Sequence, residues 1–97
     1  MSYQYPIDID WTKEEVIKVI TFFQHVEKAY ETGVKKDDFM IKYKGFKQVV
    51  PGKGDEKQIC QQFDEESGYS CYHAIQEAKK TPDGQKIQLK PNTKKRY

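Results

Sequence analysis

The amino-acid sequence predicts an all-α protein, a compact bundle or array of about four helices with an extended N-terminal segment and a basic C-terminal tail. Apolar side chains recur at helical spacing in four stretches. Glycine, proline and serine residues separate these stretches. Aromatic residues make up 13% of the 97 residues, so a modest core is expected despite a mean hydropathy of −0.95.

The residues before the first helix are expected to be extended. Tyr5 precedes Pro6 and is biased away from helical geometry. Ile7 and Ile9 alternate with aspartates as far as Trp11. Together with two glutamates downstream, these aspartates form an acidic cluster, which helix capping and the helix dipole explain better than a cation site.

The first helix is predicted over residues 13–31. Thr12 and Glu15 have the spacing of a capping box. Gly33 marks the end of the helix. At 100° per residue, the apolar side chains on one side are those of Val16, Val19, Ile20, Phe23, Val26 and Tyr30.

Three shorter helices are predicted over residues 36–49, 54–67 and 71–80. The first has a stripe of Phe39, Tyr43, Phe46 and Val50 and is stopped by Pro51 and Gly52. The second presents Ile59, Cys60 and Phe63 and ends at Gly68. Ser70 caps the third, whose inward side chains are expected to be Cys71, Tyr72, Ile75 and Ala78.

The charge distribution separates a body from a tail. Residues 1–80 are expected to form a single helical domain, and residues 81–97 a flexible basic tail, with disorder from Gln85 onward. The tail holds five basic residues against Asp83 alone. Its candidate polyanion-binding residues are Lys86, Lys90, Lys94, Lys95 and Arg96.

Short motifs spread over residues 2–80 resemble those of the YktA-like family, an uncharacterised family of short proteins from low-GC Gram-positive bacteria. The resemblance implies a compact all-helical, cytosolic protein and supplies no activity, cofactor or catalytic residue. The tail from Thr81 is longer and more basic than is expected of a member of this family. The motifs are Tyr3-Gln4-Tyr5-Pro6, Asp8-x-Asp10-Trp11, Val26-Glu27-x-Ala29-Tyr30-Glu31, Phe46-Lys47-x-Val49-Val50-Pro51 and Ser67-Gly68-Tyr69-Ser70-x-Tyr72.

The cysteines and histidines do not have metal-ligand spacing, so neither a metal nor another cofactor is expected. Cys60 and Cys71 are interpreted as small buried thiols, and His25 and His73 as solvated side chains. A disulfide is not expected, because the two cysteines are placed at unequal heights from the corner at Gly68 and the cytosol is reducing.

Glu27 falls inside the apolar stripe of the first helix. A buried carboxylate must be paired, hydrogen-bonded or protonated. We expect a tyrosine hydroxyl or a lysine at the edge of the core to contact it. The alternative is a perturbed carboxylate that lines a pocket.

Ile41 and Gly45 lie away from the main stripe of their helix. Either this helix is covered on two sides within the domain, or the two residues mark a face for a partner or a second copy. Tyr69 and Tyr72, beside the tight corner at Gly68, are further candidate contact residues.

These observations favour a non-enzymatic helical protein that acts through contacts with an unknown protein partner or with itself. Nucleic-acid binding through the basic tail is the alternative, and an enzyme that uses Glu27 and nearby tyrosines is a third reading. No apolar run approaches the roughly 20 residues of a membrane span and no signal-peptide pattern is present, so a cytoplasmic protein without membrane contact is expected.

Overall fold

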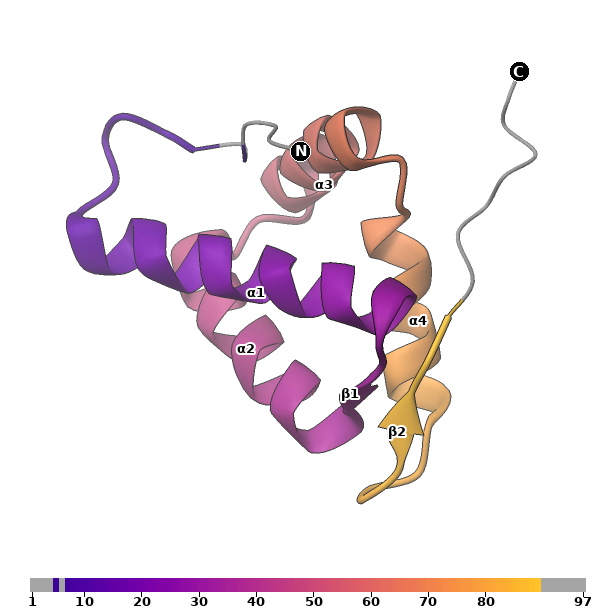
Figure 1. Cartoon of the computed structure of the whole chain (residues 1–97). Helices are drawn as coiled ribbons and strands as arrows, with labels where there is room; N and C mark the ends of the chain where they lie inside the picture. Colours follow the sequence, from indigo (N-terminus) through magenta and orange to yellow (C-terminus); the bar gives the residue numbers. More distant parts are fainter. Residues whose placement is uncertain (1–4, 6, 90–97) are drawn as a thin grey trace.

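The computed structural model describes residue 5 and residues 7–89, in which four helices form the body. Figure 1 shows α1 crossing the middle of the molecule, with α2 below it, α3 above it and α4 beside its C-terminal end. The predicted all-α class is confirmed, as are the predicted bounds of all helices except α3, which begins one residue early. The helices are α1 (Lys13–Glu31), α2 (Lys36–Val49), α3 (Lys53–Ser67) and α4 (Cys71–Lys80).

The ends of α1 are fixed by local interactions. The Glu15 N–H donates to Thr12 Oγ1 at 3.1 Å, and the Thr12 N–H donates to Glu15 Oε1 at 2.9 Å, so the predicted capping box is confirmed. After the helix, Gly33 has a φ of 91°, in the left-handed region that favours glycine. A β-carbon there would also collide with the side chain of Lys86.

A cluster of phenylalanines forms the centre of the core. The Phe22 ring lies 4.6 Å from the Phe46 ring, and the Phe23 ring lies 4.4 Å from the Phe63 ring, measured between centroids. Phe39 packs on the edge of Phe22, and all five rings are fully buried. Two neighbouring residues of α1 thus pack in different directions, Phe22 on α2 and Phe23 on both α2 and α3.

The core differs from the predicted stripes in both α1 and α4. The stripe of α1 omitted Phe22, which is buried because α2 covers a second side of this helix. Tyr72 was expected to point inward but is 67% exposed. Ala74, three residues after Cys71 on the same face, is buried instead, and its small side chain lets α4 pack closely.

Two short strands extend the fold beyond the four helices. β1 (Val34–Lys35) pairs antiparallel with β2 (Lys86–Ile87), with Val34 opposite Ile87. Ile87 is 2% exposed. The expectation of disorder from Gln85 is therefore wrong for residues 85–89, where strand pairing and an apolar contact hold the chain on the body.

The two terminal segments are only partly described. Residues 3, 4 and 6 of the segment expected to be extended lie outside the described residues, and a turn at Ile9 and Asp10 interrupts the described part. Lys86 is an exposed residue of β2. The other candidate polyanion-binding residues, Lys90, Lys94, Lys95 and Arg96, also lie outside the described residues, so binding through the tail stays a prediction.

Candidate functional site

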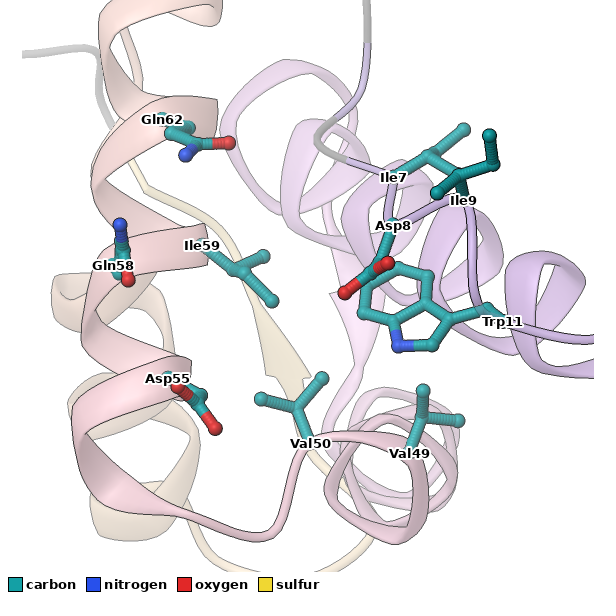
Figure 2. A pocket seen from close by; sticks show the side chains of 10 residues that line it. All are labelled: Ile7, Asp8, Ile9, Trp11, Val49, Val50, Asp55, Gln58, Ile59 and Gln62. Carbon is teal, nitrogen blue, oxygen red and sulfur yellow. The ribbon is translucent and has the colours of Figure 1, made fainter.

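A groove lies between the N-terminal segment, the end of α2 and one face of α3, as Figure 2 shows. Its volume of about 550 Å³ falls within the range of pockets that hold small ligands or side-chain anchors. The residues that line it are Ile7, Asp8, Ile9, Trp11, Val49, Val50, Asp55, Gln58, Ile59 and Gln62.

The N-terminal wall of the groove is held by its own backbone and by one anchoring ring. The carboxylate of Asp8 accepts a hydrogen bond from the Asp10 N–H at 2.9 Å, and the Asp8 carbonyl accepts one from the Trp11 N–H at 3.1 Å. Upstream, the Tyr5 ring stacks 6.4 Å from the rings of both Phe23 and Phe63. These contacts fix the segment at both ends and position Ile7 to Trp11 opposite α3.

The groove has a mixed lining, with more polar than apolar surface, and exposed apolar residues lie at its rim. Figure 2 shows the Trp11 indole, Val50 and Ile59 directed toward the interior, whereas Ile7 and Ile9 lie along one edge. Ile9 is 94% exposed and Ile7 is 48% exposed. A fully exposed isoleucine forgoes about 1.5–3 kcal/mol of burial free energy, which applies to Ile9, and the half-exposed Ile7 forgoes part of it. Two such side chains beside a groove indicate a contact surface.

The charges of the groove have one sign. Among the described residues that line it, Asp8 and Asp55 are acidic and none is basic. Figure 2 shows the two carboxylates on opposite walls, Asp8 on the N-terminal segment and Asp55 on α3. The groove therefore favours a cationic occupant over an anionic one.

The four contact residues suggested by the sequence do not line this groove. Ile41 is 60% exposed on α2, whereas the backbone of Gly45 lies against the Lys18 side chain of α1. Tyr69 stacks on Tyr30 at 4.7 Å within the molecule. An interface at these residues stays a prediction.

The sequence did not identify the lining residues of the groove as contact residues. Ile7 and Ile9 did carry a signal, because they are apolar residues outside any helix and therefore have no helical face to bury. Asp55 and Ile59 carried none, since only the packing of α3 places them opposite this segment.

Glu27 receives a hydrogen bond from a tyrosine, as one of the sequence hypotheses proposed. The Tyr5 hydroxyl donates to its carboxylate, 3.0 Å from each oxygen, and the side chain is half-buried. Burial and the negative charge of Glu31 raise the pKa of Glu27 from its ordinary value of 4.5 to about 7. Glu31 in turn accepts a hydrogen bond from the Tyr69 hydroxyl at 2.8 Å. Glu27 does not line the groove.

The raised pKa of Glu27 predicts that stability falls as the pH rises from about 4.5 to about 7. In this window the folded chain keeps a proton that the unfolded chain has already released, so raising the pH favours unfolding. We expect Glu27→Gln to flatten this part of the profile and to gain most, relative to the wild type, at pH 8. Urea midpoints at pH 5 and pH 8 measure the effect.

Glu66→Gln is the matched control, because it makes the same charge change at an exposed position of α3. It should retain the wild-type dependence on pH. Identical profiles for Glu27→Gln and Glu66→Gln would show that Glu27 does not couple to folding.

The two cysteines meet, contrary to the prediction that the corner separates them. Their sulfur atoms lie 2.7 Å apart, both cysteines are free thiols and both are buried. The tight turn at Gly68, with a φ of 82°, folds α4 back so that Cys71 reaches the level of Cys60.

Of the two histidines predicted to be solvated, His73 is exposed and His25 is half-buried. His25 Nδ1 is 2.9 Å from the carbonyl of Thr21. Within residues 5 and 7–89, the structure places no three His, Cys, Asp or Glu side chains where they can hold a metal ion.

A second cavity, of about 690 Å³, opens between α2, α3 and α4. Tyr72 and Cys60 line it together with Tyr43, whose hydroxyl donates to Glu56 at 3.0 Å. Lys79 lies over the Tyr43 ring, 5.9 Å from its centroid. The exposed tyrosine that the sequence placed among the contact residues is thus part of a cavity wall.

Fold and groove define a small all-α protein in which an anchored N-terminal segment and α3 enclose a groove lined by apolar, amide and acidic side chains. None of the described helices has the length and apolar character that crossing a membrane requires. The chain belongs to the uncharacterised protein family UPF0223, whose model matches residues 2–87. Its expected place in an uncharacterised family of low-GC Gram-positive bacteria is therefore confirmed.

Relatives from Staphylococcus aureus match nearly the whole chain. UPF0223 proteins of strain bovine RF122 / ET3-1 and of strain Newman are each 52% identical to it over 90 residues, which cover 93% of this chain and 99% of the relative. The family match ends at Ile87, so it includes both β1 and β2.

Proposed function

We propose that this protein is a protein-binding module whose groove takes a short cationic and apolar segment of a partner protein. The observation that carries the proposal is the placement of exposed Ile7 and Ile9 beside a groove whose charged lining residues, within the described part of the chain, are both acidic. Exposed apolar side chains beside an acidic groove are typical of a surface that binds another protein. They support the hypothesis of a protein-binding module over that of an enzyme.

The two kinds of side chain have different roles in this proposal. An apolar anchor of the partner enters between Trp11 and Ile59, and its burial supplies most of the affinity. Lysine or arginine residues that flank the anchor lie near Asp8 and Asp55. Exposed charge pairs contribute about 1 kcal/mol or less each, so they select the partner rather than hold it.

Trp11 provides a direct measurement of binding. It is the single tryptophan of the chain and lines the groove. We expect a synthetic peptide of alternating leucines and lysines to shift the emission of Trp11 in a saturable way. A peptide of the same length with glutamate in place of lysine should not do so, because its charges repel the walls of the groove.

Matched substitutions localise the effect. Ile9→Ser should weaken binding about tenfold and Asp55→Asn about three- to fivefold. The controls Ile17→Ser and Asp37→Asn make the same changes at exposed positions outside the groove and should bind like the wild type. Equal responses to both peptides, or equal losses in the controls, would reject the groove as the binding site.

A further inference from the structure

Cys60 and Cys71 form a defined pair of thiols that the proposed groove does not use. They are eleven positions apart in the chain, and their Sγ atoms lie 2.7 Å apart. The backbone N–H of Cys71 donates to the Asp64 carboxylate at 2.8 Å, and the Ser70 side chain accepts from the His73 N–H. The start of α4 is thus tied to α3, which holds the two sulfur atoms in register.

The two thiols differ in access. Cys71 is fully buried, whereas Cys60 is 6% exposed and lines the cavity between α2, α3 and α4. A small uncharged molecule that enters this cavity meets Cys60 but not Cys71, which does not line it. Burial raises the pKa of the Cys71 thiol, which keeps this side chain protonated and unreactive toward reagents in solution.

We propose that this thiol pair is an oxidation site for small hydroperoxides, in which Cys60 is oxidised first and Cys71 resolves it to an intramolecular disulfide. The geometry assigns both roles, because Cys60 lines the cavity and the sulfur of the fully buried Cys71 lies against the sulfur of Cys60.

The proposed reaction has two steps, oxidation of Cys60 and formation of the disulfide. The Cys60 thiol gives its proton to water, and its sulfur attacks the hydroxyl oxygen of the hydroperoxide. The O–O bond breaks, the other oxygen takes a proton back from water and leaves as alcohol or water, and Cys60 becomes a sulfenic acid. The sulfur of Cys71 then attacks the sulfenic sulfur and an S–S bond forms. The S–O bond breaks, and the departing hydroxide takes the proton of Cys71 and leaves as water.

The short distance between the sulfurs favours this second step over further oxidation. A disulfide bond is about 2.05 Å long, so the two side chains need to move little to form it. Cys60 held next to a second thiol should therefore stop at the disulfide, which a reducing thiol reverses, rather than proceed to a sulfinic acid.

The test uses the full-length reduced protein and hydrogen peroxide as the oxidant. After treatment under native conditions, the protein is denatured, alkylated with iodoacetamide and weighed by intact mass spectrometry. We expect a monomer about 2 Da lighter than the reduced chain, with neither cysteine alkylated. Reduction with dithiothreitol before alkylation should give a chain with both cysteines alkylated.

Two variants assign the roles. Cys71→Ser should accumulate a sulfenic acid at Cys60 that dimedone traps, and Cys60→Ser should keep an unmodified Cys71 under the same treatment. In the wild type, two alkylated cysteines after peroxide, a sulfinic acid at Cys60 or a disulfide between two chains would each overturn the proposal. The wild-type result decides even if a variant fails to fold.

Discussion

Replacing Phe22 by alanine should lower the free energy of unfolding by about 3–5 kcal/mol, the range for a fully buried phenylalanine. Phe22 contacts the rings of Phe23, Phe39, Tyr43 and Phe46 and is completely buried, so its loss opens a cavity between α1 and α2. Domains of this size have about 5–15 kcal/mol of stability in total. Urea denaturation followed by far-ultraviolet circular dichroism measures the change.

Ile17→Ala is the control for Phe22→Ala on the same helix. Ile17 is 54% exposed, and surface substitutions of this kind usually change stability by no more than about 0.5 kcal/mol. A loss for Phe22→Ala no greater than that for Ile17→Ala would refute the two-sided packing of α1.

Replacing Ile87 by alanine should cost about 2–5 kcal/mol, although this residue lies in the segment that the sequence assigned to a flexible tail. Ile87 is 2% exposed and pairs with Val34 of β1. Backbone hydrogen bonds continue on both sides of it, from the Lys36 N–H to the Gln85 carbonyl at 2.8 Å and from the Leu89 N–H to the Ala29 carbonyl at 2.7 Å. The same urea denaturation applies.

Gln88→Ala provides the comparison, because Gln88 is the exposed neighbour of Ile87. It should leave the urea midpoint close to that of the wild type. If Ile87→Ala behaves in the same way, β2 does not contribute to the stability of the domain.

The helix boundaries could be read from the sequence because local interactions set them. The capping box of Thr12 and Glu15 spans four residues, and Gly33 and Gly68 end helices by adopting backbone angles that favour glycine. The stripe of α2 was also visible, since Phe39 and Phe46 repeat at helical spacing and are buried. Each of these signals lies within one or two helical turns.

The inner face of α4 shows where such local reasoning fails. Periodicity cannot distinguish an aromatic residue at the edge of a stripe from one in its centre, so Tyr72 was placed inside. The structure buries Ala74 there instead, and the tyrosine lines a cavity with its side chain mostly in water. Close approach of α4 to the body favours the small residue.

The candidate site was predicted only in part. For Glu27, which lies outside the groove, the sequence predicted a contact with a tyrosine hydroxyl or with a lysine. The partner is Tyr5, 22 positions away, and no pattern in the sequence joins the two residues. Ile7 and Ile9 stood out as apolar residues outside a helix, yet the groove needs α3 as its opposite wall.

The sequence by itself determined the helical class of this protein and where its helices end, because caps, glycine stops and side-chain periodicity act between residues a few positions apart. Only the tertiary structure decided that Cys60 meets Cys71, that Ile87 completes a small sheet and that Asp8 faces Asp55 across a groove. These relations join residues far apart in the chain, and their energies depend on how the helices pack together rather than on local preference.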